Sequence, residues 1–407
     1  MKIEISNVKG FQDFLPPESL KRDTIKKIIE RNFKIYGFIP IETPVIEFDE
    51  FIRGDSIQEE EAVSDRFKLK DRGGRNLGLR YEFTFQLARI FKQNPLIKLP
   101  FKRYQIGEVF RDEPTGPKRF RQFTQCDIDI IGDSSQEAEA EILSCFSDIL
   151  KELNIKAEIE VNNRKLIQSL IESVQIENIK EVMRELDKID KIGEDNVKAN
   201  LRKYADVNQI ITLFKLLEKD IPFFKDNAFE GVEELQNLIK ECELYNIQLK
   251  MNPFLVRGLN YYTGNIFEIK TESSKESLAG GGRYDKVVGK YIGKDIPAVG
   301  ISFGLERLTD LADVKIESIP NVLIISIEQK EHAIKLIKKL RNSGVSCSLT
   351  SDKINKALEY ANSLQIPYVI LLGEKEIEQK KINLRNMSTG EERMLTEKQL
   401  LRIFAKK

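Results

Sequence analysis

The sequence has few of the residues on which many catalytic and metal-binding sites depend. It has no tryptophan and only one histidine, His332, among 407 residues. Metal sites with two histidine ligands are therefore excluded, and hydrolase triads are not expected. His332 lies in a stretch of helical periodicity from Glu331 to Leu340, and no residue near it has a metal-ligand spacing. We expect it on the surface of a helix.

Cysteine is also scarce, and long apolar runs are absent. The cysteines are scattered and form no CxxC pair, which is typical of free thiols in a reducing compartment and not of a cysteine-rich zinc site. No apolar run approaches the roughly 20 residues that a transmembrane helix needs. The N-terminus, Met-Lys-Ile-Glu-Ile, lacks the apolar stretch of a secretory signal. We therefore expect a cytoplasmic protein without a membrane segment or a protein metal site.

Neither sign of charge is in excess, because Lys plus Arg and Asp plus Glu both number 65. Net charge thus gives no indication of a nucleic-acid partner, although a local basic face remains compatible with it. A chain with 41% hydrophobic and 32% charged residues is typical of a globular protein. Its length predicts two or three domains.

The first region combines helices with short strands. Apolar residues at helical spacing predict a helix over 23–36, followed by a strand over 38–41. Residues 63–131 are rich in strand-like runs. Ser134 and Glu137 have the spacing of a capping box, which predicts a helix immediately after them.

The middle of the chain changes character. Residues 164–248 are poor in glycine, dense in charge and helical in period, which predicts a helical insertion that interrupts a mixed sheet. Strand signals return over Phe254–Ile269, and Gly280–Gly282 is predicted to form a turn. A helix is expected after Gly304.

The last region reads as a separate domain. Residues 310–320 carry little pattern and read as a linker. Beyond them strand-like and helix-like runs alternate over 321–407, which predicts a small α/β domain with a largely parallel sheet. The preceding domain is then expected to span 1–320.

The stretch 101–132 carries the most chemical information. Two strand-like runs flank a charged loop at about 112–121 and predict an antiparallel hairpin. Along the second run apolar or small residues alternate with polar ones, so one face of the strand belongs to a core and the other is a polar row. The row consists of Phe123, Gln125, Asp127 and Asp129. Taken alone, it reads as a solvated surface; facing a cleft, it would be a site.

Arginines at the same hairpin favour a site. Arg111 ends the first run, and Arg119 and Arg121 lie across the loop from it. The planar guanidinium group matches phosphate oxygens through paired hydrogen bonds, so a cluster of this kind can hold a polyphosphate. Phe123 beside them can stack on a base ring.

This arrangement resembles motif 2 of the class II aminoacyl-tRNA synthetases, in the form found in the histidyl-tRNA synthetase family. An arginine that closes a strand is followed by an acid two residues later, a loop and RQF-x-Q-x-x-x-D. The resemblance implies that Arg111 grips the α-phosphate of ATP, Phe123 packs on adenine and Glu113 lies near it. It also implies that Gln125 holds the α-amino group of histidine and that Asp129 receives the imidazole.

The decapeptide LVRGLNYYTG at 255–264 resembles the histidine-specific signature of the same family. The competing reading of this stretch is an ordinary strand and turn. The resemblance implies that Arg257 reaches the α-phosphate and the substrate carboxylate, which makes Arg111 and Arg257 the catalytic pair. It also implies that Tyr261 and Tyr262 close over the imidazole. Asn260 stands where the family usually has an acid, and in the motif 2 loop Lys118 replaces a common glycine.

Shorter segments agree with the resemblance. The motif 3-like Gly304-Leu-Glu-Arg opens a helix and implies that Arg307 contacts the γ-phosphate. The segment 79–84 resembles the strand from which Glu82 and Thr84 reach the α-amino group. Residues 279–285 resemble a segment that lines the amino-acid pocket; the competing reading is a phosphate-binding glycine loop, but no P-loop lysine–serine pair follows.

The resemblance covers essentially the whole chain and implies a fold, a reaction and partners. Residues 37–44 resemble motif 1, which implies a homodimer, and 358–373 resemble part of an anticodon-binding domain. The implied fold is α/β and α+β multidomain, with an antiparallel-sheet catalytic domain, a helical insertion and a C-terminal α/β anticodon-binding domain. The implied reaction activates L-histidine with ATP and Mg²⁺ and charges tRNA(His).

Two alternatives stay open. One is the synthetase-like regulatory subunit of ATP phosphoribosyltransferase, which generally lacks the anticodon domain and does not keep the arginine set. The other is an inactive RNA-binding paralogue. The arginines and the final α/β domain favour the enzyme.

Overall fold

The computed structural model describes residues 5–53, 65–116, 119–256, 261–271, 277–316 and 319–404. The chain forms two compact units, a first unit up to Val314 and a second unit from Lys315. No helix among these residues is long and apolar enough to cross a membrane. The same residues hold no group of three His, Cys, Asp or Glu side chains placed to bind a metal ion.

An eight-stranded sheet is the centre of the first unit, in the order β1-β5-β6-β11-β10-β9-β7-β8. Its two outer pairs, β1–β5 and β7–β8, are parallel, and the pairs between them are antiparallel. The strands are β1 (Ile39–Pro40), β5 (Phe101–Phe110), β6 (Gln122–Ile131), β7 (Glu158–Asn163), β8 (Leu249–Met251), β9 (Asn265–Lys270), β10 (Ser277–Arg283) and β11 (Ala298–Gly304). The predicted hairpin over 101–132 is confirmed as β5 and β6.

Helices α1 (Glu18–Ile35), α4 (Gln136–Glu152) and α12 (Leu305–Leu311) pack on one another and on one face of this sheet. Aromatic rings join the layers, since Phe146 of α4 stacks on Phe303 of β11 at 3.9 Å between centroids. Ser135, and not Ser134, caps α4, because Asp133 accepts hydrogen bonds from the amide and hydroxyl of Ser135.

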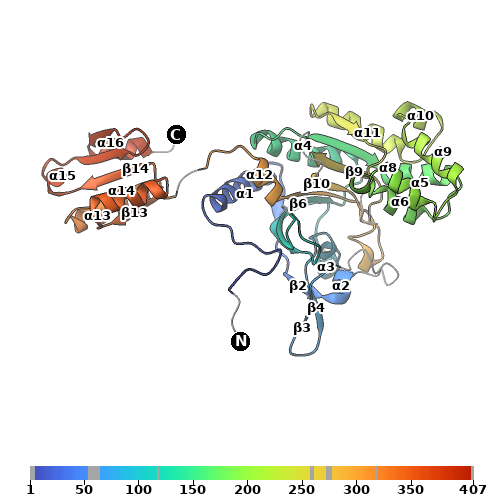
Figure 1. Cartoon of the computed structure of the whole chain (residues 1–407), viewed down its shortest axis with the longest axis horizontal. Coiled ribbons are helices and arrows are strands. Elements are labelled where there is room, and N and C mark those ends of the chain that lie inside the picture. The colour runs from blue at the N-terminus through green and yellow to red at the C-terminus, as the bar shows by residue number, and fades with distance from the viewer. Residues whose placement is uncertain are drawn as a thin grey trace. The chain divides into compact units, whose positions relative to one another are not determined.

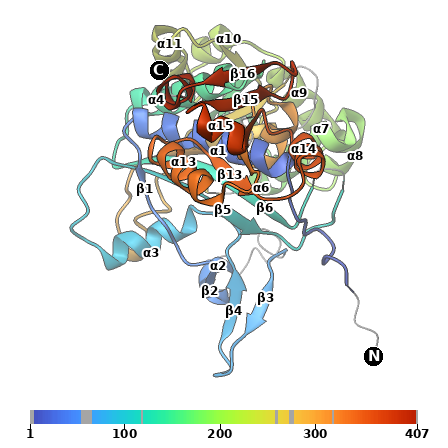
Figure 2. The ribbon, with the colours of Figure 1, turned by 90° about the vertical axis from the view of Figure 1, so that its left-hand side faces the viewer.

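A small sheet, a short helix and the predicted insertion complete the first unit. Strands β2 (Ile46–Phe48), β4 (Asn76–Leu79) and β3 (Lys68–Lys70) pair in that order beside α2 (Asp49–Arg53). Figure 2 shows β3 and β4 as a hairpin that projects from the unit. Helix α3 (Phe85–Gln93) leads back to β5.

The helical insertion is confirmed between β7 and β8, where Figure 1 shows most of its helices gathered at one end of the large sheet. Its helices are α5 (Arg164–Ser173), α6 (Ile179–Leu186), α7 (Ile189–Ile192), α8 (Glu194–Leu201), α9 (Val207–Leu217), α10 (Ile221–Asp226) and α11 (Val232–Leu244).

Two strand predictions are wrong in detail. Among the described residues of the strand expected over Phe254–Ile269, strand structure begins only at Asn265, and Pro253 and Phe254 form a turn. Gly280–Gly282 lie inside β10 and not in a turn. The physical reason is close packing between strands, because a Cβ atom on Gly281 would lie 2.0 Å from the carbonyl oxygen of Gly300 in β11. A 3₁₀ turn (Lys290–Ile292) connects β10 to β11.

The second unit is a five-stranded sheet in the order β13-β12-β14-β15-β16. Three strands are parallel, as predicted, but β15 and β16 add an antiparallel edge that was not expected. Side chains of β12 alternate between two apolar clusters, one with α13 and α16 and one with α14. The elements are β12 (Val322–Ser326), α13 (Lys330–Asn342), β13 (Cys347–Thr350), α14 (Ile354–Ser363), β14 (Tyr368–Leu372), α15 (Glu374–Glu378), β15 (Ile382–Asn386), β16 (Glu392–Leu395) and α16 (Glu397–Phe404).

All of the cysteines are free and buried, as predicted for thiols without a disulfide role. The first unit contains Cys126, Cys145 and Cys242, and the second contains Cys347.

Candidate functional site

The polar row of β6 is a buried floor in the first unit. Asp127 and Asp129 are 5% and 3% exposed, so the reading of this row as a solvated surface is wrong. The side chains of Arg103, Tyr284 and Ser302 lie against these two carboxyl groups and help to bury them. The alternate side chains of β6 belong to the hydrophobic core, as the pattern predicted: Cys126, Ile128 and Ile130.

Asp129 lies at the centre of this floor and is paired with a buried cation. Arg103, opposite it on β5, is 0% exposed and forms an ion pair with Asp129 at 2.5 Å. The hydroxyl of Tyr284 donates a hydrogen bond to the same carboxylate. Burial raises the pKa of Asp129, while the charge of Arg103 and the hydrogen bond from Tyr284 oppose this rise. The pairing favours an ionised Asp129.

Asp127 is the second carboxyl group of the row and differs in charge. Its Oδ1 accepts a hydrogen bond from the hydroxyl of Ser302 on β11. Burial raises the pKa of Asp127 to about 8, because the charge of Arg103 offsets only part of the desolvation and the neighbouring Asp129 adds to it. Asp127 therefore carries a proton at neutral pH.

Gln125 presents a hydrogen-bond acceptor that the described part of the chain leaves unused. Its Nε2 donates to the hydroxyl of Ser302 at 3.1 Å. Its Oε1 is buried and has no hydrogen-bond partner among the described residues. Buried polar atoms without a partner are rare and costly, so this oxygen is suited to a donor on a ligand.

Glu82 and Thr84 lie in the turn before α3. The carboxylate of Glu82 accepts hydrogen bonds from the amides of Thr84 at 2.5 Å and Phe85 at 2.7 Å. Burial raises the pKa of Glu82, and these amide bonds act against the rise. Arg103 donates to the carbonyl oxygen of Phe83 at 3.4 Å, which joins this turn to the floor.

The tyrosine pair lies against both parts of the site. The ring of Tyr261 is 5.9 Å from Phe85 and 5.7 Å from Tyr284, both edge-on. Tyr262 lies 4.6 Å from Tyr261 between ring centroids. Tyr261 thus bridges the Glu82 turn and the tyrosine that binds Asp129. Three sequence-predicted positions, Arg257, Asn260 and Lys118, lie outside the described residues.

A second cluster forms where β5 ends. The guanidinium carbon of Arg111 lies 4.4 Å from the ring centroid of Tyr81 and 5.0 Å from that of Phe123. Glu113 accepts a hydrogen bond from the Tyr81 hydroxyl at 3.1 Å and pairs with Arg119. Although burial raises the pKa of Glu113, the Arg119 hydrogen bond and the charges of Arg111 and Arg119 bring it below its usual value. Arg111, Phe123 and Glu113 are thus brought together as the sequence predicted.

Arg307 follows β11 in the first turn of α12. Its guanidinium donates to the carbonyl oxygen of Ser277, where β10 begins. The preceding Glu306 anchors the helix, because it pairs with Arg22 of α1 at 2.8 Å and accepts the Thr124 amide of β6 at 3.1 Å. The start of α12 is therefore held against the strand that carries the polar row.

A cavity of about 950 Å³ lies beside the tyrosine pair. One wall comes from the insertion, including Arg164, Lys165 and Lys180, and another includes Tyr261 and Tyr262. The remaining residues include two lysines, Lys286 and Lys290, and two acids, Asp285 and Asp295. Five cations against two acids favour an anionic ligand there.

Arg103 and Ser302 escaped the sequence prediction, and so did the protonation of Asp127, whereas Tyr284 lies in the segment 279–285 that the resemblance assigned to the amino-acid pocket. The sequence did contain a signal for Arg103, because a hairpin with its turn near residue 116 places Arg103 opposite Asp129. Ser302 comes from β11, whose pairing with β6 is set by tertiary contacts, and no local pattern indicated it.

Comparisons with known proteins match both units of the chain. A family model described as "Histidyl-tRNA synthetase" matches residues 10–308, and one described as "Anticodon binding domain" matches 321–407. "Histidine--tRNA ligase 1" of Bacillus cereus is 39% identical over 413 residues, which cover 96% of this chain and 95% of the relative. The crystal structure of histidyl-tRNA synthetase from Nostoc sp. PCC 7120 superposes with a TM-score of 0.86 at 27% identity and covers 99% of both chains.

A further solved structure, from Bacillus halodurans, carries the double description of ATP phosphoribosyltransferase regulatory subunit and histidyl-tRNA synthetase. It has a TM-score of 0.74 at 20% identity and covers 88% of this chain and 97% of that one, which shows the shared fold alone. The matches to the catalytic and anticodon-binding models run through both units, and the B. cereus relative matches along nearly its full length. The chain belongs to the histidyl-tRNA synthetase family.

Proposed function

We propose that this chain activates L-histidine with ATP and transfers the histidyl group to tRNA(His). Family membership and the full-length match to a histidine–tRNA ligase support this function. The observation that carries it in the structure is Gln125, whose buried Oε1 has no partner among the described residues, while Asp129, paired with Arg103, lies four residues further along the same strand. An amino acid with an α-ammonium group and a donor in its side chain satisfies both.

The histidine subsite is assigned to the floor and its surroundings. Gln125 accepts a hydrogen bond from the α-ammonium group, which Glu82 and Thr84 also approach. Asp129 accepts the imidazole N–H, and Tyr261 and Tyr262 cover the ring. These roles rest on the resemblance, and the ring contacts that join Tyr261 to Phe85 and Tyr284 support them.

The ATP subsite is assigned to the second cluster. Arg111 binds the α-phosphate, Phe123 stacks on adenine, Glu113 lies near the base, and Arg307 reaches the γ-phosphate. Mg²⁺ bound together with ATP would neutralise part of the negative charge of the phosphates beside Arg111. Arg257 completes the arginine set from the signature segment.

The reaction needs no side-chain nucleophile. An oxygen of the histidine carboxylate attacks the α-phosphorus, and the bond to pyrophosphate breaks to give histidyl-adenylate. The terminal ribose hydroxyl of the tRNA then attacks the histidyl carbonyl carbon, and AMP leaves. Alignment of the two reactants and stabilisation of negative charge by Arg111 and Arg257 supply the catalysis. The basic cavity beside Tyr261 and Tyr262 suits the phosphates of the incoming tRNA end.

The domain limits, assembly and location are part of the proposal. We assign 1–320 to the catalytic domain, with the insertion at about 164–248, and 321–407 to anticodon binding. A homodimer is supported by exposed apolar side chains around the motif 1 segment, including Ile35 at 70%, Ile39 at 50% and Ile46 at 49% exposure. Such a patch is typical of a protein interface. We assign the chain to the cytoplasm, where its proposed substrates meet.

Histidine-dependent ATP–pyrophosphate exchange tests the function. We expect exchange by the wild-type chain, and a rise of about 10- to 100-fold in the histidine KM for Gln125→Leu, since a hydrogen bond to a charged group contributes roughly 1.5–3 kcal/mol. Gln105→Leu is the matched control, because this buried glutamine of β5 bonds to Thr43 instead. Histidine binding without exchange would favour the regulatory-subunit reading. No histidine binding at all would favour an RNA-binding paralogue.

A further inference from the structure

The helical insertion begins at a junction of three consecutive residues at the end of β7: Asn162, Asn163 and Arg164. Both asparagines are 0% exposed. Asn163 is the N-cap of α5, since its Oδ1 accepts a hydrogen bond from the amide of Lys165 at 2.9 Å. An N-cap needs only this acceptor, so the remaining polar atoms of the two asparagines require another explanation.

Asn162 holds the chain just before the signature segment. Its Nδ2 donates to the carbonyl oxygens of Pro253 at 3.0 Å and Leu255 at 3.1 Å. Its Oδ1 accepts the amide of Asn163 at 2.8 Å, which fixes the orientation of the side-chain amide. One buried side chain thus holds two backbone carbonyls that lead toward the tyrosine pair.

Asn163 and Arg164 hold the chain just after the tyrosine pair. The Nδ2 of Asn163 donates to the Oδ1 of Asn265 at 2.8 Å, and the backbone amide of Arg164 donates to the carbonyl oxygen of Gly264 at 2.9 Å. Tyr261 and Tyr262 therefore lie on a segment whose two flanks are bound to neighbouring residues of one junction.

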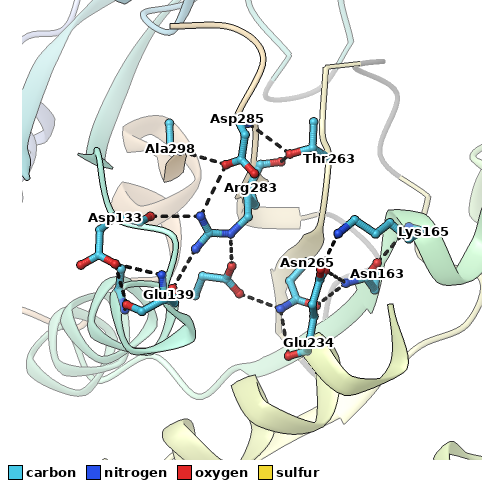
Figure 3. Close-up of polar contacts among 12 residues, drawn as sticks. Asp133, Glu139, Asn163, Lys165, Glu234, Thr263, Asn265, Arg283, Asp285 and Ala298 are labelled. Carbon is cyan, nitrogen blue, oxygen red and sulfur yellow. Dashed lines mark hydrogen bonds and ion pairs between the residues drawn. The ribbon is translucent and has the colours of Figure 1, made fainter. Parts of the chain in front are cut away.

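The same contacts continue into a buried polar network, which Figure 3 shows. Asn265 donates to Glu139 at 2.7 Å, and Glu139 pairs with Arg283. The carbonyl oxygen of Arg283 accepts the amide of Thr263 at 2.8 Å, directly beside Tyr262. The network thus returns to the segment from which it started.

The network also includes the insertion. Asn163 donates to Glu234 of α11 at 2.9 Å, and Glu234 pairs with Lys165 of α5. Helix α11 approaches the junction closely, because a Cβ atom on Gly231 would lie 2.3 Å from Asn163 Oδ1. Gly231 also has a φ of +80°. A side chain there is therefore disfavoured both by this close contact and by the left-handed backbone conformation.

We propose that Asn162 and Asn163 are positioning residues for histidine binding, which hold both flanks of the segment that carries Tyr261 and Tyr262. This inference rests on the proposed function, in which the tyrosine pair covers the imidazole. Neither asparagine lines the cavity beside the tyrosine pair. None of the contacts described above joins either asparagine to Arg111 or Phe123. Their loss should therefore affect histidine and leave ATP binding nearly unchanged.

Two variants remove the positioning contacts while keeping local structure. Asn162→Asp has the same shape and keeps the acceptor for the Asn163 amide, but its carboxylate repels the carbonyl oxygens of Pro253 and Leu255. Asn163→Ser keeps an N-cap acceptor for α5, since serine caps about as well as asparagine, but cannot reach Asn265 or Glu234. Asp206→Ala is the matched control, because Asp206 caps α9 within the same insertion and has no contact with the signature segment among its hydrogen bonds.

The readout is the KM for histidine and the KM for ATP in pyrophosphate exchange, with thermal melts to show that each variant is folded. We expect a rise of about tenfold or more in the histidine KM for both asparagine variants, with the ATP KM within about twofold of wild type. Asp206→Ala should lower the melting temperature and change neither KM.

Three outcomes would overturn the inference. An unchanged histidine KM in both asparagine variants, with an active wild type, would show that the junction does not position the pocket. Equal changes in the two KM values would indicate general structural damage. A wild-type chain without histidine-dependent exchange would overturn the proposed function first, and the positioning role with it.

Discussion

Asp129 occupies space that a single glycine leaves open. A Cβ atom on Gly300, its cross-strand neighbour in β11, would lie 2.0 Å from Asp129 Oδ1 and 3.0 Å from the carbonyl oxygen of Ile128. Because both strands are held by ladder hydrogen bonds, the carboxylate and not the backbone is expected to move. The position of Asp129, to which we assign the imidazole, thus depends on a residue that has no side chain of its own.

We predict that Gly300→Ala displaces Asp129 and raises the histidine KM by about tenfold or more, with a loss of stability of about 1–3 kcal/mol from overpacking. Pyrophosphate exchange and urea unfolding measure the two effects. Gly73→Ala, in the turn between β3 and β4, is the control, because its nearest atom beyond its neighbours would be 3.4 Å away, an ordinary contact. An unaltered histidine KM in Gly300→Ala would remove Asp129 from the histidine subsite.

Asp127 should make stability depend on pH. Burial raises its pKa to about 8, whereas an unfolded aspartate has a pKa of about 3.9. Between these values the folded chain holds a proton that the unfolded chain has lost, so the contribution of Asp127 to the free energy of unfolding falls as pH rises through this window.

Asp127→Asn removes this titration and keeps an acceptor for the Ser302 hydroxyl. We predict that the free energy of unfolding of the variant, relative to that of wild type, rises by about 1–3 kcal/mol from pH 5 to pH 8. Urea unfolding at both pH values measures this difference. Taking the difference between the two proteins cancels the titration of the other groups. A difference that does not change with pH would mean that Asp127 is ionised throughout.

At the scale of elements, one buried ion pair joins the first helix to the helix that carries Arg307. Arg22 of α1 and Glu306 of α12 are 10% and 8% exposed in their side chains, and Arg22 also donates to Thr124 of β6 at 3.2 Å. Removing one partner of a buried pair leaves the other charge without compensation.

We therefore predict that Arg22→Ala lowers the free energy of unfolding by about 3 kcal/mol. Lys27→Ala on the same helix is the control, because its pair with Asp23 is solvated, with side chains 69% and 48% exposed. Urea unfolding at neutral pH compares the two variants. Equal effects of the two substitutions would mean that burial does not decide the strength of these pairs.

Local patterns predicted elements well where one period dominated. Alternation along β6 identified both of its faces, and helical periodicity located the insertion. Prediction failed where the deciding contact was distant in sequence. Gly281 lies in a strand because Gly300 approaches it, and Ser135 caps α4 because Asp133 turns the chain one residue later than the motif indicated. In the site, the motifs predicted which residues of the hairpin lie together, such as Arg111 with Phe123, but the charge of Asp127 depends on burial and on Arg103, which only the folded sheet supplies.

At the scale of the whole molecule, the contacts described for the proposed histidine and ATP subsites lie within the first unit. We predict that deletion of 321–407 leaves pyrophosphate exchange within a few-fold of wild type. Charging of tRNA(His) should fall by about 100-fold, the equivalent of ~2.7 kcal/mol of lost tRNA contacts. Full charging efficiency by the folded truncated chain would show that the second unit does not read the anticodon.

The burial of the thiols has a consequence for following how this chain unfolds. Burial raises the pKa of Cys242 to about 12 and that of Cys126 well above its usual value, so both sulfurs are inaccessible and protonated in the native state. A thiol reagent should then find no target until a unit opens. Opening of the first unit alone exposes Cys126, Cys145 and Cys242, whereas opening of the second exposes only Cys347. The number of modified sulfurs per molecule, read by mass at each denaturant concentration, therefore distinguishes which unit has opened, without any engineered label.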